Sequence, residues 1–478
     1  MNLKKNNQTV CPPEHTGSPL KPVEDYLRQH HGRFVRELCD YLRFPSISAG
    51  RQNAKGLSHC SRWLVEHCGK IGLEAELSRT KGNPVVVART PRQTGSRKPH
   101  YLVYGHYDVQ PPEPLELWKS PPFRPRIAGG TLFARGASDN KGQHFAHLKA
   151  VEAYLTTGTE LPCDLTFIIE GEEEIGSPSL PGFLRKHRAR LNCETVVISD
   201  TALYDLRHPS LTYGLRGICG LEVTLHGPSR DLHSGMFGGS IENPAMALCQ
   251  MLARLRDAQG RITTPGFYDD VLALSAFERA HFLEHPFETE AYKKSLGVPQ
   301  LFGEAGFTPI EQRSARPTLE INGLTSGYQG DGGKTIIPAW ARAKLTMRLI
   351  PHQQPKKMLA LTIAHLKKLC PPTVRMKIIT EHGGEPYIVS PENEHVQAAL
   401  EALRSAFGRE PLLVREGGSI PIVNEFKRIL KADSLLLGLA LPDDNAHSLN
   451  EKFNLDVFAK GMLMSAYLWQ KLPRAGNS

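Results

Sequence analysis

Apolar residues follow two alternating patterns over the first 200 positions of the chain. Short β-branched or aromatic runs predict strands at residues 84–88, 100–104, 165–169 and 195–199. Between them lie helical patterns, the clearest at residues 143–155, where Leu148, Val151 and Leu155 fall on one face. Strands that alternate with helices are typical of an α/β domain with a largely parallel sheet.

The pattern changes after residue 213. It predicts a strand at 221–225, a helix that begins at Asn243-Pro244, strands at 318–321 and 341–349, a helix at 355–369 and a strand at 373–379. This β-α-β-β-α-β order indicates a ferredoxin-like sandwich. In the strand at 341–349, apolar residues alternate with largely basic ones such as Arg348. The segment 257–317 is too long for a plain loop, so it must carry its own helices or partner contacts.

The alternation of predicted helices and strands resumes beyond residue 385. The sequence predicts a helix at 392–407 that stops at Gly408, and a strand at 434–441 that leads to "PDDNAHSLNEKF". We therefore expect one α/β domain that is interrupted by a smaller inserted domain. The boundaries that we expect are a flexible tail at 1–22, the first part of the α/β domain at 23–212, the insertion at 213–385 and the second part at 386–478.

Composition narrows the class of protein. Of the 478 residues, 40% are hydrophobic and 22% are charged, as in a folded soluble protein, and no apolar run is long enough for a membrane span. The net charge is +9, but Lys and Arg are scattered rather than gathered into a basic stripe, so we expect no nucleic-acid partner. Nine cysteines without a C-x-x-C pair indicate reduced thiols and a cytoplasmic location.

Four acids follow the strand predicted at 165–169 directly, in the stretch "IIEGEEEIGS". A solvated acidic loop is one interpretation. The other is that a positively charged ligand lies among the carboxylates. The rest of the chain has to decide between them.

Potential metal ligands recur at the carboxyl ends of the predicted strands. They are His106 with Asp108, Asp139 just before a helix, Glu173 with Glu174, Asp200, and His447. Sites in open α/β sheets gather outside these strand ends. Each residue alone is more typical of a structural role, but together they favour a metal site.

The ligand types indicate the chemistry. Nitrogen and carboxylate oxygen without thiolate suit Zn²⁺ or Mn²⁺, with Co²⁺ possible, in a hydrolytic site. Two ions roughly 3.5–4 Å apart need one shared carboxylate, and each needs a histidine and one further acid. The residues that fill this scheme are His106, Asp139, Glu174, Asp200 and His447. Asp108 is then placed to orient the His106 imidazole, and Glu173 to act as general base for a metal-bound water.

Seven motifs resemble, in order and spacing, those of the carnosinase-like cytosolic non-specific dipeptidases. They are "GHYDVQP", "RGASDNKG", "EGEEEIGS", "VISD", "DLHSGMFGGS", "REGGSIP" and "NAHSLNEKF". That family belongs to a superfamily of two-metal peptidases that also holds aminoacylases. The resemblance implies a catalytic α/β domain, with a mixed, largely parallel sheet between helices, that is interrupted by a ferredoxin-like lid through which the protein forms a homodimer.

The resemblance also implies roles for individual residues. Asp139 would bridge the two ions, with His106 and Asp200 on one and Glu174 and His447 on the other, and the Asp139–Asn140 peptide bond would be cis. His233 of the partner subunit would have a catalytic role and stabilise the tetrahedral oxyanion. A second group would bind the substrate: Thr335 of the partner subunit, Arg348 on the substrate carboxylate, and Gly418 and Ser419.

The implied activity is hydrolysis of dipeptides or short peptides with a free C-terminal carboxylate. An N-acyl amino acid deacylase with the same two-metal mechanism is the alternative, and a catalytically silent interaction protein on this fold is a third, which the intact ligand set disfavours. Tyr107, "PPEPLELWKS" and "DTALYDLRHPS" depart from relatives in loops that line substrate pockets, so side-chain preference stays open.

Overall fold

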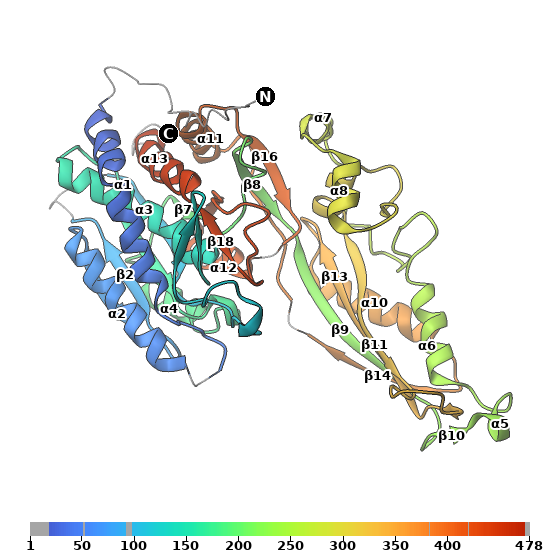
Figure 1. The fold of residues 1–478 in the computed structure, drawn as a ribbon. Helices are drawn as coiled ribbons and strands as arrows, with labels where there is room; N and C mark the ends of the chain where they lie inside the picture. The colour runs from blue at the N-terminus through green and yellow to red at the C-terminus, as the bar shows by residue number, and fades with distance from the viewer. Residues whose placement is uncertain (1–18, 51–52, 92–97, 382, 419, 474–478) are drawn as a thin grey trace, which may run out of the picture. The chain divides into compact units, whose positions relative to one another are not determined.

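The structure is a computed structural model that describes residues 19–50, 53–91, 98–381, 383–418 and 420–473. The chain divides into two compact units (Figure 1). Unit 1 comprises residues 1–213, 389–414 and 425–478, and unit 2 comprises residues 214–388 and 415–424. Most of the predicted tail lies outside the described residues, and the first helix begins at Lys21.

Unit 1 is an α/β domain. Its helices are α1 (Lys21–Leu42), α2 (Ala54–Lys70), α3 (Gly142–Thr157), α4 (Leu180–His187), α11 (Glu394–Phe407) and α13 (Leu455–Lys471). Its strands are β1 (Glu74–Ser78), β2 (Val85–Arg89), β3 (His100–His106), β4 (Arg126–Ala128), β5 (Thr131–Phe133), β6 (Asp164–Glu170), β7 (Thr195–Ile198), β17 (Asp433–Leu436) and β18 (Lys452–Asn454). Three elements contain residues of both units: β8 (Ser210–Leu215), β16 (Leu412–Glu416) and α12 (Pro421–Leu430).

The main sheet of unit 1 has the strand order β1-β2-β6-β3-β7-β17-β8. The central pairs β6–β3, β3–β7 and β7–β17 are parallel, whereas β1–β2, β2–β6 and β17–β8 are antiparallel. The sheet is therefore mixed with a parallel centre, as the alternating sequence pattern predicts. Every residue of β6 is buried, which is typical of a central strand that is covered on both faces.

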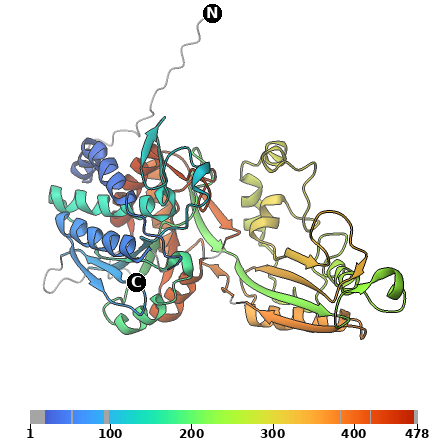
Figure 2. The ribbon, with the colours of Figure 1, turned by 60° about the horizontal axis from the view of Figure 1, so that its bottom comes forward.

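Helices shield this sheet from water. The long helix α3 is buried over most of its length and packs between α1 and α13 (Figures 1 and 2). Two further helices contact the sheet: α2 packs on β1 and β2, and α11 contacts β17. The register aligns Tyr104 of β3 with Ile168 of β6 and Ile198 of β7. The carboxyl ends of these three strands therefore lie side by side at one edge of the sheet.

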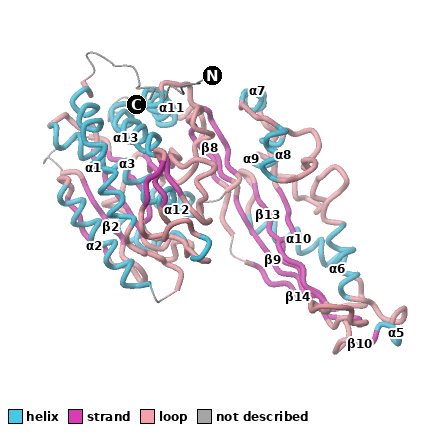
Figure 3. The backbone as a smooth tube through the Cα atoms, viewed as in Figure 1, coloured by secondary structure: helices cyan, strands magenta, loops and turns pink. Residues whose placement is uncertain are grey.

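Unit 2 is built around a four-stranded antiparallel sheet in the order β11-β13-β9-β14 (Figure 3). Its strands are β9 (Gly217–His226), β10 (Leu232–His233), β11 (Thr318–Ser326), β12 (Ile336–Ile337), β13 (Trp340–Leu349), β14 (Arg375–Thr380) and β15 (Tyr387–Ile388). Its helices are α5 (Ser234–Phe237), α6 (Pro244–Ala253), α7 (Ala276–Glu284), α8 (Thr289–Leu296), α9 (Pro309–Ser314) and α10 (Pro355–Leu369). The order β9-α6-β11-β13-α10-β14 confirms the ferredoxin-like prediction.

The core of unit 2 lies on one face of this sheet. In β13 the apolar residues Ala343, Leu345 and Met347 are buried and pack with residues of α6 and α10, whereas Lys344 is exposed. The alternation in the sequence therefore identifies the buried face correctly. The segment 257–317 carries α7, α8 and α9 and has a small core of its own around Phe282 and Ile310, as its length predicts.

One predicted strand is shorter than expected. The pattern predicts a strand over 434–441, but β17 ends at Leu436. Its parallel partner β7 ends at Ile198, and beyond it the chain passes close to Thr201. A Cβ atom at Gly438 would lie 2.2 Å from the Thr201 carbonyl oxygen, so only glycine fits this approach. Within the described residues, each helix is too short or too polar to cross a bilayer.

The close approach at Gly438 predicts a loss of stability on substitution. Gly438→Ala should lower the free energy of unfolding by about 1–3 kcal/mol, because the methyl group has to displace backbone atoms. Gly69→Ala is the matched control, since nothing lies within 4 Å of the corresponding Cβ in helix α2. Denaturant unfolding should show a lower midpoint for Gly438→Ala alone, and equal midpoints for both variants would contradict this assignment.

Candidate functional site

The predicted metal ligands meet at the carboxyl edge of the unit 1 sheet. His106 is the last residue of β3, Glu174 lies in the turn Glu173–Ile175 after β6, and Asp200 follows β7. Asp139 precedes α3 in the short turn Ala137–Lys141, and His447 lies in the loop before β18. Segments that are far apart in the sequence therefore supply one cluster.

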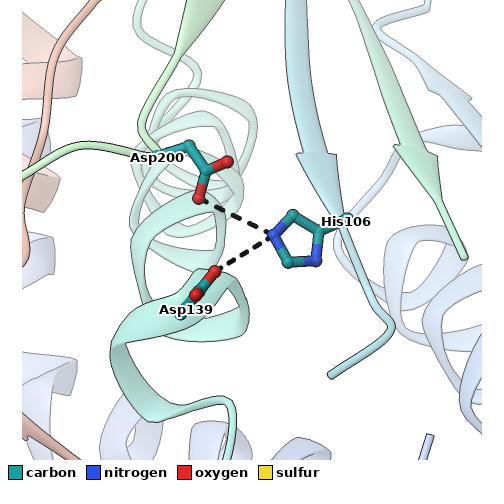
Figure 4. A group of neighbouring side chains, drawn as sticks. All are labelled: His106, Asp139 and Asp200. Carbon is teal, nitrogen blue, oxygen red and sulfur yellow. Dashed lines mark ion pairs between the residues drawn. The ribbon is translucent and has the colours of Figure 1, made fainter. Parts of the chain in front are cut away.

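The first group comprises His106, Asp139 and Asp200 (Figure 4). The His106 Nε2 atom lies 3.3 Å from Asp139 Oδ1 and 3.6 Å from Asp200 Oδ1. All three donor atoms lie close enough to hold a single ion. His106 is fully buried, and its Nε2 has no hydrogen-bond partner among the described residues.

The second group comprises Asp139, Glu174 and His447. The His447 Nε2 atom lies 2.8 Å from Asp139 Oδ2 and 3.1 Å from Glu174 Oε2. One oxygen of Asp139 therefore faces His106 and the other faces His447. The positive φ of 59° at His447 marks a backbone conformation that few non-glycine residues adopt and that is common at functional sites.

The side chains fit a pair of divalent cations. A buried imidazole nitrogen without a hydrogen-bond partner is costly unless a cation binds it. The donor set is imidazole and carboxylate without thiolate, which suits Zn²⁺, Mn²⁺ or Co²⁺. A carboxylate that faces both groups is what a dinuclear centre requires.

The carboxylates alter the titration of the two histidines. Hydrogen bonds to Asp139 and Glu174 raise the pKa of His447 to about 10. At His106 burial lowers the pKa, but the neighbouring carboxylates outweigh burial and hold the pKa well above its ordinary value. Metal binding needs neutral imidazole, so binding of the ions would release these protons.

Glu173 lies beside the cluster and is partly buried. Burial raises the pKa of its carboxyl well above the ordinary value, the nearby His106 opposes this, and Asp200 and Glu174 raise the pKa further. A carboxyl that readily takes up a proton has the property that a general base needs.

Asp108 holds the turn that carries Glu173 and Glu174. Its Oδ1 accepts a hydrogen bond from the Glu173 backbone N–H at 3.2 Å, and its Oδ2 accepts one from the Glu174 N–H at 3.1 Å. The His106 Nδ1 lies 3.0 Å from the Asp108 main-chain oxygen and 3.4 Å from its Oδ1. Asp108 therefore contacts both the imidazole and the acidic turn.

The remaining acids of "IIEGEEEIGS" have structural contacts. Glu170 is buried and its Oε1 accepts hydrogen bonds from the Tyr104 hydroxyl and the Ser177 hydroxyl, both at 2.7 Å. Glu172 accepts hydrogen bonds from the backbone N–H groups of Asn83 at 3.0 Å and Ser179 at 3.2 Å. The acidic loop is therefore not simply solvated: two of its acids fix the backbone, and the other two face the cluster.

Glu451 was not among the predicted site residues, although it lies in the motif "NAHSLNEKF". It is fully buried, and its Oε1 accepts hydrogen bonds from the backbone N–H groups of Ser138 at 2.9 Å and Asp139 at 3.0 Å. Its Oε2 accepts from the Gly136 N–H at 2.8 Å and from Arg135 at 2.9 Å. One carboxylate thus fixes the backbone of the turn that carries Asp139.

Asn140 is a second residue that sequence reasoning missed. Its Nδ2 donates to Asp200 Oδ1 at 2.9 Å, and its Oδ1 accepts from the His106 backbone N–H at 3.2 Å. The Asp139–Asn140 peptide bond is cis, as the family resemblance implies. Gln110 adds a hydrogen bond of 2.8 Å to Glu174 Oε2. A buried amide between strands gives no periodic signal in the sequence.

The predicted substrate-binding residues lie in unit 2. His233 and Thr335 are exposed and adjacent, because β10 pairs with β12 and the Ser234 N–H donates to the Thr335 oxygen at 3.1 Å. Arg348 is partly buried on β13, and Gly418 is exposed in the loop after β16. Ser419 lies outside the described residues.

Residues 102–471 match the model of peptidase family M20/M25/M40. The chain belongs to this family. It is 32% identical to Cys-Gly metallodipeptidase dug1 of Schizosaccharomyces pombe, over 93% of this chain and 96% of the relative. It is 33% identical to the human Beta-Ala-His dipeptidase, over 94% of this chain and 91% of the relative.

Solved structures of the M20/M25/M40 peptidases share the fold. Human carnosine dipeptidase 1 superposes with a TM-score of 0.80 at 28% identity, covering 96% of this chain and 99% of that one. The dipeptidase Dug1p of Saccharomyces cerevisiae gives a TM-score of 0.78 at 30% identity, covering 94% and 98%. Dinuclear metal binding is named for another member of the family, from Bacillus subtilis.

The contacts of Glu451 predict a defect in metal binding. Glu451→Gln should weaken binding of Zn²⁺ or Mn²⁺ by about 10–100-fold, because an amide nitrogen would face backbone donors and displace the turn of Asp139. Calorimetric titration of the metal-free protein measures this directly. Glu66→Gln on the exposed side of α2 is the control, and equal affinities of both variants would contradict the role of Glu451.

Proposed function

We propose that the chain is a metal-dependent hydrolase that cleaves the amide bond of dipeptides or short peptides with a free C-terminal carboxylate. The observation that carries this proposal is the Asp139 carboxylate, which faces His106 with one oxygen and His447 with the other, beside Glu173. The two relatives described above bear dipeptidase names, so the alternative of an N-acyl amino acid deacylase is not favoured.

Five residues would hold two divalent ions, with Zn²⁺ or Mn²⁺ as the first choices and Co²⁺ as another. His106 and Asp200 would serve one ion, Glu174 and His447 the other, and Asp139 both. Such ions lower the pKa of water and polarise the scissile carbonyl group. Asp108, Asn140 and Glu451 would orient the ligands through the hydrogen bonds described above.

Glu173 would move the proton. As a carboxylate it would accept a proton from the attacking water, and as a carboxylic acid it would donate that proton to the leaving amine. Burial and the acids Asp200 and Glu174 raise the pKa of this carboxyl above its ordinary value, which strengthens it as a proton acceptor. The backbone N–H of Glu173 is fixed by Asp108, which limits the positions that the carboxylate can reach.

A second subunit would complete the site. His233 and Thr335 lie beyond the Trp340 end of β13, whereas Arg348 lies near its other end (Figure 1). Arg348 lies eight residues after Trp340 along the strand, a distance of about 27 Å. An extended dipeptide spans only about 7 Å. Both groups can contact one substrate only if they come from different chains, which supports a homodimer through unit 2.

The substrate contacts follow from this arrangement. His233 of the partner subunit would stabilise the tetrahedral oxyanion, and Thr335 of the partner subunit would lie beside it. Arg348 would hold the substrate carboxylate, which a guanidinium binds with two parallel hydrogen bonds. Gly418 and Ser419 would supply further contacts to the substrate. We propose unit 2 as the lid and dimerisation domain.

A reducing compartment fits the thiols, and we propose a cytoplasmic location. Eight cysteines lie in the part of the chain that the structure describes, and all are free. Burial raises the pKa of several, including Cys68 to about 12, so that these thiols stay protonated and unreactive.

A substrate panel tests the reaction class. The metal-loaded enzyme should hydrolyse free dipeptides such as Cys-Gly and β-Ala-His but not matched N-acetyl amino acids. Glu173→Gln should lower kcat by about 10²–10⁴-fold because the amide cannot accept the proton. Glu66→Gln should retain activity. Cleavage of N-acetyl amino acids alone would move the protein to the deacylases.

Mixed dimers test the contribution of the partner. Glu173→Gln and His233→Ala homodimers should each be nearly inactive, whereas co-expression of the two chains should restore about a quarter of the sites, since half of the dimers are mixed and each mixed dimer has one intact site. Hydrolysis per subunit, with dimer content from size-exclusion chromatography, measures this. Mixed dimers without activity would show that His233 acts within its own chain.

A further inference from the structure

Unit 2 contains a cavity of about 750 Å³ between its sheet and the segment 257–317. This volume lies in the range that takes small-molecule ligands. Charged side chains from both the strands and the segment line it, and the apolar side chains come mainly from the segment. The residues used below are Arg216, Arg313, Glu320 and Arg348 on the polar side and Tyr292 and Phe302 on the apolar side.

The sheet register places two arginines together at this cavity. Arg348 of β13 is directly opposite Ile218 of β9. Arg216 precedes Ile218 by two residues, and side chains two residues apart in extended chain point to the same face. Arg216 and Arg348 are therefore diagonal neighbours on the face opposite the apolar core, with Cβ atoms about 7–8 Å apart.

Helix α9 adds a third arginine. Its start is fixed by a capping box between Thr308 and Glu311, and Arg313 in its last turn lines the cavity. The Arg313 guanidinium lies 5.7 Å from the centre of the Tyr292 ring. Burial and then the charge of Arg348 lower the pKa of Arg216 to about 10, and Arg313 adds to this, so the three side chains lie close enough to interact.

The acids of the cavity do not balance these charges. Both carboxylate oxygens of Glu304 bind Arg316, at 2.8 Å each, and Arg261 adds a bond of 3.1 Å. Glu304 is therefore neutralised by other cations. The remaining acid, Glu320, is exposed on β11 and compensates for one charge. Five arginines and two glutamates line the cavity, so its lining carries a formal surplus of three positive charges.

Neutral groups hold Arg216 in position. Its Nε donates to the Gly417 oxygen at 3.2 Å, and its Nη1 donates to the Arg316 oxygen at 3.4 Å. These bonds fix the guanidinium without removing its charge. Guanidinium groups that are held in place and partly buried bind carboxylates more strongly than solvated ones do.

We propose that this cavity binds a small dicarboxylate, with Arg313, Arg216 and Arg348 on the two carboxylates and the apolar wall around Tyr292 and Phe302 on its carbon chain. A dipeptide with a C-terminal Glu or Asp is such a ligand, since its α-carboxylate and side chain together carry two charges. A free dicarboxylate is the other source of the same chemistry. Only the link to the dipeptide rests on the proposed function.

Paired substrates test the link to catalysis. Ala-Glu and Ala-Gln have the same shape and differ by one charge, so the wild-type enzyme should show a KM about tenfold lower for Ala-Glu. Arg313→Gln should abolish this difference by raising the KM for Ala-Glu about tenfold more than the KM for Ala-Gln. Arg254→Gln, an exposed arginine of the same unit that does not line the cavity, is the control.

Calorimetric titration with glutarate separates the two sources. If the wild-type protein binds glutarate, Arg313→Gln weakens that binding, and Ala-Glu is not preferred as a substrate, then the cavity is a site for a free dicarboxylate. The inference is overturned if the enzyme hydrolyses Ala-Gln, shows no preference for Ala-Glu, and binds no glutarate in a way that depends on Arg313. That result leaves the proposed function intact. Arg313-dependent binding of glutarate without hydrolysis of any dipeptide supports the cavity and rejects the proposed function.

Discussion

The geometry of the metal cluster depends on one partly buried carboxylate that faces both histidines. Asp139 presents one oxygen to His106 and the other to His447, and burial makes this arrangement costly without compensating cations. A second carboxylate, Glu451, fixes the backbone from Gly136 to Asp139 by hydrogen bonds. The loop after β17 thus supplies both a ligand and the support for another ligand, which couples the two groups of the cluster.

The acidic turn after β6 shows how charge is distributed around such a cluster. Glu170 accepts hydrogen bonds from hydroxyl groups and Glu172 accepts them from backbone N–H groups, so both side chains are held in place. Glu173 and Glu174 face the histidines instead, and Asp108 fixes their backbone. The contacts of each acid therefore determine its role: Glu170 and Glu172 fix the structure, and Glu173 and Glu174 belong to the metal site.

Much of this could be predicted from the sequence, for physical reasons. Strand ends concentrate the ligands because parallel strands share an edge, and period-two alternation identifies the buried face of β13. Glu451 and Asn140 were missed because a hydrogen bond to distant backbone leaves no local pattern. The strand at 434–441 was predicted too long because an apolar run does not reveal where its partner β7 ends. The position of Arg216 beside Arg348 could not be predicted from the sequence, because it depends on the register between β9 and β13.

The most direct test of the account is the state of the metal centre in the wild-type protein and in Asp139→Asn. Electron paramagnetic resonance of the Mn²⁺-loaded protein, with elemental analysis, gives both the number of ions per chain and their magnetic coupling. We predict two coupled ions in the wild type and loss of coupling in Asp139→Asn, because the amide cannot serve both ions as a shared carboxylate does. A fully active wild-type enzyme with a single, uncoupled ion would contradict the shared-carboxylate account.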